Sequence, residues 1–145
     1  MRIITIEGNI FNLKNKYSLV HCIAADAIMG KGIALQFRNF YPEMQLYIRN
    51  NKPSVPDCIS YTANSGRTIY NLVTKESSYG KPTRDSLTKS LILLKQAIVK
   101  NGDKYIAMPL IGAGLDRLSW NETEKTIKEL FNDVDVNIAV VKFVK

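Results

Sequence analysis

The hydrophobic and polar positions along this chain follow two different periods. Six short apolar runs, each bounded by polar or turn-forming residues, have the length and composition of β-strands. They cover residues 2–7, 19–24, 58–63, 68–74, 105–109 and 136–144. The residues Asn64-Ser65-Gly66-Arg67, between the third and fourth runs, are typical of a hairpin turn. We therefore expect those two strands to be antiparallel.

Two longer segments show the spacing of amphipathic helices. The first lies between Thr83 and Gly102, which suit a helix start and stop, and its apolar positions are Leu87, Leu91, Leu94 and Ile98. The second begins after Ser119 and Glu122, which have the spacing of a capping box. Its apolar positions are Ile127, Leu130, Phe131 and Val134.

Two shorter helices are expected nearer the N-terminus, one from after Gly30 to Phe40 and one over residues 43–49. The segment 50–57 is short and predicts a surface loop rather than a linker between domains. Strands that alternate with helices, together with one hairpin, are typical of α/β proteins. We expect a single domain over residues 1–145, with a three-layer α/β/α fold and a mixed, mostly parallel six-stranded sheet.

The composition is that of an ordinary globular protein. Hydrophobic residues make up 46% of the 145 positions and charged residues 23%, which is enough for a core. No apolar stretch approaches the ~20 residues that span a bilayer. The start of the chain also lacks the apolar run of a signal peptide. We predict a cytoplasmic monomer without membrane association.

The cysteines and the histidine indicate whether disulfides or a metal site are expected. Cys22 and Cys58 lie in separate strand-like runs rather than in a C-x-x-C pair, and we interpret them as buried free thiols of a cytosolic protein. With His21 as the single histidine and no cluster of ligands, no metal site is expected. No cofactor is expected either.

The net charge of +7 favours partners that carry phosphate, such as nucleotides, nucleic acid or modified protein. The lysines are scattered along the chain and form no basic block. Unmodified nucleic acid is therefore the weakest of these candidates.

Two glycine-rich segments carry the strongest chemical signal. In residues 109–116 an apolar run leads into Gly112 and Gly114, then the acidic Asp116, and a helix start follows. Gly30 and Gly32 come after the strand 19–24 and open the next helix. Such loops bring backbone N–H groups close to an anion, and two of them at strand carboxyl ends face one crevice. We predict a site for a diphosphate or a ribose phosphate, and the absence of a P-loop sequence argues against triphosphate hydrolysis.

Three side chains near these loops are candidates for chemistry. Lys75 ends an apolar strand; on its own it is explained most simply as a solvated strand end, and the alternative is a nucleophile or acid–base group. A carboxylate at Asp116 is costly beside an anion site unless it handles protons or binds a hydroxyl. His21 lies within a strand, where a core or hydrogen-bonding role is favoured over catalysis.

Five short strings are spread over nearly the whole chain. They are EGNI from Glu7, HCIA from His21, MGKGIALQF from Met29, LVTK from Leu72 and PLIGAGLDRLSW from Pro109. Together they resemble the macrodomain, an ADP-ribose-binding module. The last string and Lys75 are similar to the branch of the terminal ADP-ribose protein glycohydrolase, which removes ADP-ribose from acidic side chains. Two related branches are antitoxins that strip ADP-ribose from thymidine in DNA and phosphatases acting on ADP-ribose 1''-phosphate.

The resemblance implies a role for each matching position. Gly8, Asn9 and Ile10 match the segment that holds the adenine, although many members have Asp where this chain has Asn9. Lys75 matches the lysine proposed to attack the anomeric carbon of the distal ribose. Asp116 matches the acidic residue that activates that step or resolves the covalent intermediate. The other positions implied to bind ADP-ribose are His21, Ile23, Ala24, Met29, Gly30, Lys31, Gly32, Ile33, Thr74, Pro109, Leu110, Ile111, Gly112, Ala113, Gly114, Leu115 and, as a candidate for stacking on the adenine, Phe143.

The implied activity is an ADP-ribosyl hydrolase that needs no metal and acts on ADP-ribosylated protein. Asp116-Arg117-Leu118 matches the protein-directed branch better, because the DNA-directed antitoxins lack the acidic residue in this loop. Lys31 within MGKGIALQF is closer to the antitoxin type, and ADP-ribosylated nucleic acid stays an alternative substrate. A phosphatase of ADP-ribose 1''-phosphate and a non-enzymatic reader of ADP-ribose are two further functions that this resemblance allows.

Overall fold

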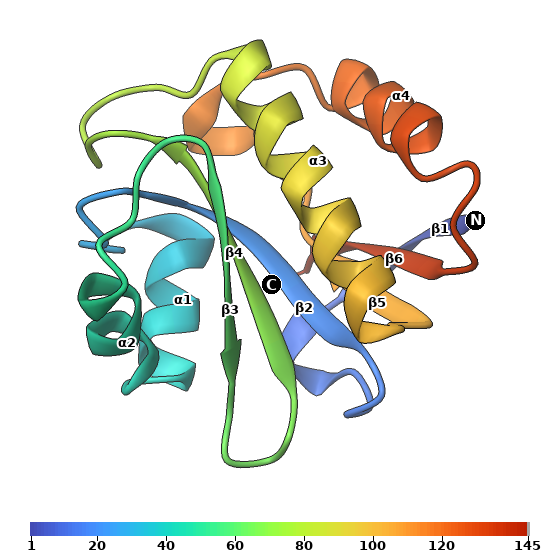
Figure 1. Ribbon diagram of the computed structural model, residues 1–145, viewed down its shortest axis with the longest axis horizontal. Helices are drawn as coiled ribbons and strands as arrows, with labels where there is room; N and C mark the ends of the chain where they lie inside the picture. Colours follow the sequence, from blue (N-terminus) through green and yellow to red (C-terminus); the bar gives the residue numbers. More distant parts are fainter. Residues whose placement is uncertain (145) are drawn as a thin grey trace.

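Six strands form one sheet in the order β1-β6-β5-β2-β4-β3 (Figure 1). The computed structural model describes residues 1–144. Its strands are β1 (Arg2–Gly8), β2 (Ser18–Ala24), β3 (Asp57–Thr62), β4 (Thr68–Lys75), β5 (Tyr105–Met108) and β6 (Asn137–Phe143). β3 pairs antiparallel with β4, and the other neighbouring strands of this sheet are parallel. The mixed sheet and its hairpin are confirmed, and each strand boundary lies within one residue of the predicted one.

Helices cover both faces of this sheet and complete the three expected layers (Figure 1). They are α1 (Gly32–Phe40), α2 (Met44–Asn50), α3 (Arg84–Asn101) and α4 (Trp120–Leu130), and two 3-10 turns, η1 (Ile10–Asn12) and η2 (Gly114–Asp116), lie in loops. Within residues 1–144, none of the helices combines the length and the apolar character needed to cross a membrane.

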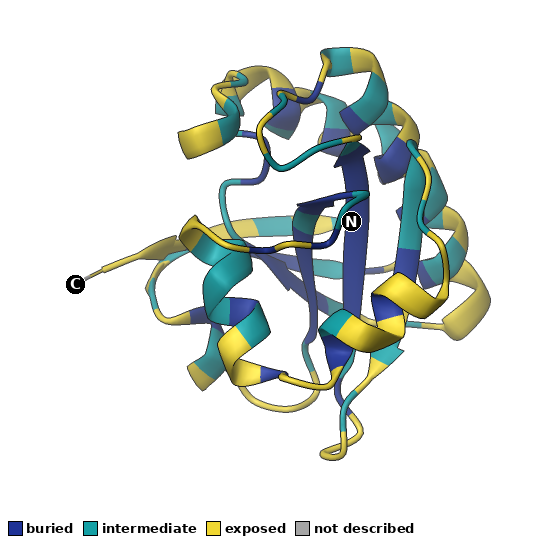
Figure 2. Cartoon of the chain, turned by 90° about the vertical axis from the view of Figure 1, so that its left-hand side faces the viewer, coloured by how far each residue is buried: buried dark blue, intermediate teal, exposed yellow. Residues whose placement is uncertain are grey.

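The core consists of two apolar clusters, one on each face of the sheet. Leu91 of α3 and Ile127 of α4 are fully buried in the first cluster, while Phe37 of α1 and Ile48 of α2 are fully buried in the second. The central strands are covered on both sides (dark blue in Figure 2), which explains why β2 and β4 are continuous apolar runs. Alternate residues of β2 and β4 therefore face opposite clusters.

The helix starts differ from the prediction in one detail. At α3, the Thr83 hydroxyl accepts a bond from the Ser86 amide and the Ser86 hydroxyl binds the Thr83 amide, which makes a reciprocal capping box. At α4, the Ser119 hydroxyl accepts from the Glu122 amide as expected, but the Glu122 carboxylate lies 3.6 Å from Arg84. Arg84 therefore links the start of α3 to the start of α4, an ion pair that the capping-box pattern did not predict.

Candidate active site

The two glycine loops predicted from the sequence follow the neighbouring strands β2 and β5. After β2 the chain continues to α1 on one face of the sheet, and after β5 it continues to α4 on the other face. The carboxyl ends of these strands are thus the point at which the connections diverge. Open α/β sheets bind their ligands in the crevice at this point. The topology supports the location that the glycine pattern predicted.

The first glycine loop (residues 25–32) packs against the second (residues 109–118). Gly32 has a φ of +58°, and a Cβ atom at this position would lie 3.2 Å from the Leu115 side chain. The left-handed backbone conformation favours glycine here, and a larger residue would also require the Leu115 side chain to shift. Within the first loop, Met29 is buried, whereas Gly30 and Lys31 are exposed; Ile33, in the first turn of α1, is half-buried.

The second glycine loop turns sharply against the start of α3. Gly112 has a φ of +76°, and a Cβ atom there would come within 2.8 Å of the Leu87 side chain. The Leu118 amide donates to the Gly112 carbonyl at 2.6 Å and closes the loop. Ile111 is buried, Pro109, Leu110 and Ala113 are half-buried, and Gly114 and Leu115 are exposed. The exposed Leu115 side chain lies next to Gly32 of the first glycine loop.

Lys75 and Asp116 meet at the edge of the second glycine loop. Lys75 is the last residue of β4, and Asp116 is the last residue of η2. The Lys75 Nζ atom donates to Asp116 Oδ1 at 2.9 Å, and the two side chains are only 16% and 15% exposed. The structure therefore brings together the amine and the carboxylate that the sequence singled out. A solvated strand end does not describe this environment of Lys75.

Cys22 is the other nucleophilic side chain near this pair. Burial raises the pKa of its thiol far above the ordinary value, and the charge of Asp116 raises it further, although the Gly112 amide acts in the opposite direction. Burial also raises the pKa of Cys58, to about 12. Both thiols are free and stay protonated at neutral pH. The thiolate is the nucleophilic form of cysteine, and the candidate nucleophile is therefore the amine.

The segment matched to adenine lies at the opposite end of the sheet. β1 and β6 pair in register with Gly8 opposite Phe143, and the Phe143 side chain is 54% exposed. An exposed aromatic ring thus lies beside the predicted adenine segment. The Asn9 side-chain oxygen Oδ1 already accepts the Phe11 amide at 2.9 Å as the cap of η1. One lone pair of this oxygen remains for an adenine amino group.

His21 lies in the core below the crevice. It is fully buried, stacks on Phe37 with a ring separation of 3.8 Å, and its Nε2 atom lies 2.6 Å from Asn71 Oδ1. Burial lowers the pKa of His21 to about 4, against the opposing hydrogen bond to Asn71. This position agrees with the hydrogen-bonding core role rather than with ligand contact.

Three further residues from the predicted set, Ile23, Ala24 and Thr74, are also buried. They lie at the ends of β2 and β4, directly below the loops. They therefore belong to the core at the strand ends, next to the segments that follow β2 and β4.

Sequence reasoning missed Asp26 and Ser78. Asp26 follows the end of β2 by two residues, and its carboxylate accepts bonds from the Ser78 amide at 2.7 Å and from the Ser78 hydroxyl at 2.6 Å. Ser78 lies in the β4–α3 segment (residues 76–83) that begins directly after Lys75. The available signal was an acidic residue two positions beyond the end of a buried strand.

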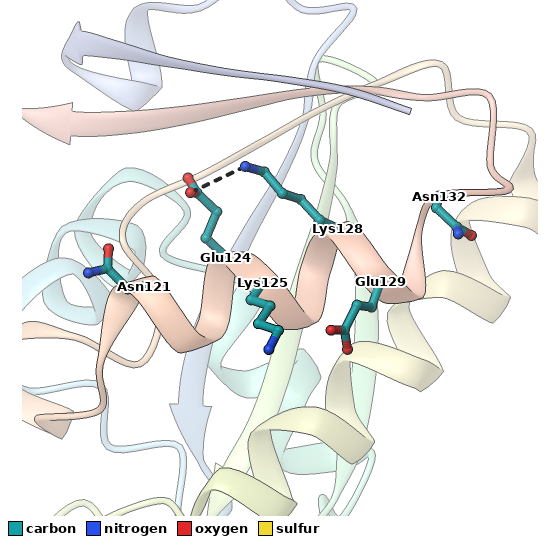
Figure 3. A pocket seen from close by; sticks show the side chains of 6 residues that line it. All are labelled: Asn121, Glu124, Lys125, Lys128, Glu129 and Asn132. Atoms are coloured by element: carbon teal, nitrogen blue, oxygen red, sulfur yellow. Dashed lines mark ion pairs between the residues drawn. The ribbon is translucent and has the colours of Figure 1, made fainter.

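A shallow hollow also lies along α4 (Figure 3). Its lining residues are Asn121, Glu124, Lys125, Lys128, Glu129 and Asn132. Lys128 and Glu124 form an ion pair across one turn at 3.5 Å. This surface mixes both signs of charge and includes no residue of the glycine loops, so it does not have the character of a diphosphate site. In residues 1–144 no group of three His, Cys, Asp or Glu side chains is placed to hold a metal ion.

Known proteins resemble this chain over nearly its whole length. The Macro domain family model matches residues 20–127. The ADP-ribose glycohydrolase OARD1 of Bos taurus is 39% identical, and the match covers 96% of this chain and 90% of that protein. A DNA ADP-ribosyl glycohydrolase of Thermus aquaticus is 27% identical over 86% of this chain, which corresponds to 36% of that protein.

Solved structures agree on the fold. The macrodomain of Mycobacterium tuberculosis DarG is 24% identical and superimposes with a TM-score of 0.87, covering 97% of this chain and 96% of that chain. The family match, the sequence identity to OARD1 and the shared fold lead to the same assignment. The chain belongs to the macro domain family.

Proposed function

We propose that this protein is a hydrolase that removes ADP-ribose from modified substrates, with Lys75 as the nucleophile and Asp116 as the acid–base group. The observation that carries the proposal is the 2.9 Å contact between the Lys75 amine and the Asp116 carboxylate beside two glycine loops. The glycohydrolase relatives support the same activity, because the nearly full-length match to OARD1 includes this part of the chain.

The order of the strands fits the parts of ADP-ribose. We place the adenine at the ends of β1 and β6, next to Phe143, and the diphosphate between the glycine loops after β5 and β2. The distal ribose then lies at the end of β4, next to Lys75. These five strands are neighbours in the sheet and span about 19 Å at roughly 4.8 Å per strand. Two ribosides joined by a diphosphate fit along such an edge.

The chemistry needs an amine and a base in contact. Asp116 accepts a proton from Lys75, and the neutral amine attacks the anomeric carbon of the distal ribose. A carbon–nitrogen bond forms as the bond between the anomeric carbon and the acceptor oxygen breaks, and the acceptor takes the proton held by Asp116 and leaves as a carboxylic acid. The bond between the same carbon and the ring oxygen then breaks, a proton passes from the nitrogen through Asp116 to the ring oxygen, and an imine results. Water, deprotonated by Asp116, adds to the imine carbon, and Asp116 returns the proton to the nitrogen. The carbon–nitrogen bond breaks, which frees ADP-ribose and restores the amine.

The acceptor that we propose is an acidic protein side chain. The resemblance of Asp116-Arg117-Leu118 to the protein-directed branch supports this choice. ADP-ribose on thymidine in DNA is the alternative, supported by Lys31 within MGKGIALQF and by the DNA ADP-ribosyl glycohydrolases at 27% identity. A 1''-phosphate is the third acceptor to be compared, and a reader of ADP-ribose would cleave none of the three.

The test is a comparison of substrates and variants. Wild type, Lys75→Ala and Asp116→Ala are incubated with glutamate-ADP-ribosylated protein, with DNA carrying ADP-ribosyl-thymidine and with ADP-ribose 1''-phosphate. Release of ADP-ribose is followed by chromatography. We expect wild type to act fastest on the protein substrate, and both variants to be slower by at least about a hundredfold.

Two variants serve as controls for the loss of charge. Lys89→Ala removes a lysine from an exposed pair on α3, and Asp133→Ala removes an exposed aspartate paired with Lys95. Both are expected to keep full activity. Unchanged activity in Lys75→Ala and Asp116→Ala would refute the mechanism. Binding of ADP-ribose without turnover of any substrate would identify a reader instead.

The proposal also covers the cellular compartment and the oligomeric state of the protein. Free thiols at Cys22 and Cys58 suit a reducing compartment, and we propose a cytoplasmic protein. We also propose a monomer, as expected from the sequence. A gel-filtration mass near 16 kDa would support this, and a dimer that persists at nanomolar concentration would contradict it.

A further inference from the structure

The Asp26 carboxylate connects the two segments that border Lys75. Oδ1 accepts the Ile28 amide of the first glycine loop at 3.1 Å and the Ser78 hydroxyl at 2.6 Å, while Oδ2 accepts the Ser78 amide at 2.7 Å. One side chain thus accepts three hydrogen bonds from two loops that are 50 residues apart in the sequence. Such an arrangement fixes the distance between these loops.

The β4–α3 segment is held at a second point on its other side. The Lys81 Nζ atom donates to the Leu115 carbonyl of the second glycine loop. The Ala25 amide also donates to the Lys75 carbonyl at 2.8 Å. The backbone of Lys75 and the segment after it are therefore attached to both glycine loops. The Ala25 amide attaches the Lys75 backbone to the first loop, and the Asp26 side chain attaches the segment after it.

The positive charge of Lys75 also acts on the Asp26 carboxylate. Its partial burial would by itself raise the pKa of the carboxyl, but hydrogen bonds from Ser78 and Ile28 and the positive charge of Lys75 outweigh this and hold the pKa below its ordinary value. The carboxylate is ionised at neutral pH. An ionised acceptor gives stronger hydrogen bonds than a neutral one, which suits a contact that must keep two loops in place.

We infer that Asp26 is a positioning residue that sets the place of Lys75 relative to the first glycine loop and thereby to the bound ribose. This inference rests on the proposed function. Asp26 does not touch the reacting atoms in this assignment; it acts through Ser78, Ile28 and the backbone of Lys75. A misplacement of an attacking group by about 1 Å can cost up to a hundredfold in rate.

The experiment measures kcat and KM of the glycohydrolase reaction in four variants. Asp26→Asn keeps the shape but loses the charge and places an amide where an acceptor is needed, and we expect kcat to fall about tenfold with KM within about threefold of wild type. Ser78→Ala keeps the amide donor and loses only the hydroxyl, so a fall of about threefold is expected. In the double variant the fall is expected to match that of Asp26→Asn alone.

Ser77→Ala is the matched control, because the Ser77 hydroxyl binds the Tyr79 amide within the same turn and does not contact Asp26. Its kcat is expected to stay within about twofold of wild type. A purely structural role of Asp26 would lower thermal stability and leave the kcat of the folded fraction unchanged. Wild-type kcat in Asp26→Asn, or purely additive effects in the double variant, would overturn the inference.

Hydrogen exchange separates this inference from the proposed function. Asp26→Asn is expected to speed exchange of the Ser78 and Ile28 amides at least tenfold, whether or not the protein turns over a substrate. If wild type lacks turnover but this acceleration is seen, the proposed function fails and the positioning contact stands. If exchange is unchanged, the positioning role fails. Should Asp26→Asn not fold, Ser78→Ala supplies the same readouts.

Discussion

The Lys75 amine and the Asp116 carboxylate lie 2.9 Å apart although 41 residues separate them in the sequence. Both side chains are largely withdrawn from water. Such a pair contributes little to stability, because the loss of hydration offsets most of the attraction between the charges. Its presence at the end of β4 is better explained by chemistry. The carboxylate that holds the ammonium group is also the base that can accept its proton.

The first prediction separates the charge of Lys75 from its role as a nucleophile. Lys75→Arg keeps a cation that can pair with Asp116, but a guanidinium does not lose its proton in proteins. We expect native thermal stability and ADP-ribose affinity within a few fold of wild type, with turnover lower by at least about a hundredfold, as for Lys75→Ala. Calorimetry and an ADP-ribose release assay measure the two quantities. Activity near the wild-type level would exclude an amine nucleophile.

The second prediction concerns the backbone of the second glycine loop. Gly112→Ala places a methyl group within 2.8 Å of the Leu87 side chain at a φ of +76°. We expect a loss of about 1–3 kcal/mol in the free energy of unfolding and at least fivefold weaker ADP-ribose binding. Gly66→Ala in the β3–β4 hairpin is the control, since its φ is +89° but the added methyl meets open space. It is expected to lose about 1 kcal/mol and to keep its affinity.

The third prediction assigns the adenine contact. Phe143 is exposed and lies opposite Gly8 in the parallel β1–β6 pair. Stacking of a base on an aromatic ring contributes about 1–3 kcal/mol. We therefore expect Phe143→Ala to weaken ADP-ribose binding roughly five- to a hundredfold, with kcat and stability nearly unchanged. Tyr47→Ala on α2, where the ring is 43% exposed, is the control for loss of a surface aromatic. Equal affinity in both variants would place the adenine elsewhere.

The sequence was sufficient to predict the strands and the positions of the two glycine loops. Apolar runs limited by turn residues predicted every strand, because burial on both faces leaves few polar positions in β2 and β4. The glycines in the sequence marked the loops, and the structure shows the reason: Gly112 has a positive φ, where other residues are strained. Lys75 alone was ambiguous in the sequence. The resemblance to macrodomains was needed to connect it with Asp116.

The contacts between loops were not accessible from the sequence. Asp26 and Ser78 are ordinary polar loop residues, and their bonds depend on how two distant segments fold over the sheet edge. The orientation of the His21 side chain could not be predicted from the sequence either, since a shift of one residue in a strand reverses the face to which a side chain points. Glu122 had the right spacing for a capping box, yet Arg84 on a neighbouring helix competes for its carboxylate.

The fourth prediction follows from the buried His21. Its pKa is about 4 in the folded protein and 6.5 in the reference state, so between these values the unfolded chain binds a proton that the folded protein does not. Stability therefore falls as the pH falls, by up to roughly 1.4 kcal/mol per pH unit. Urea unfolding at pH 7 and pH 4.5 is expected to show wild type losing about 2–3 kcal/mol more than His21→Gln, which has no imidazole to titrate. Asp26 and Asp133, whose pKa values are lowered, act mainly below this window. Parallel losses in the two proteins would mean that His21 is accessible to protons in the folded state.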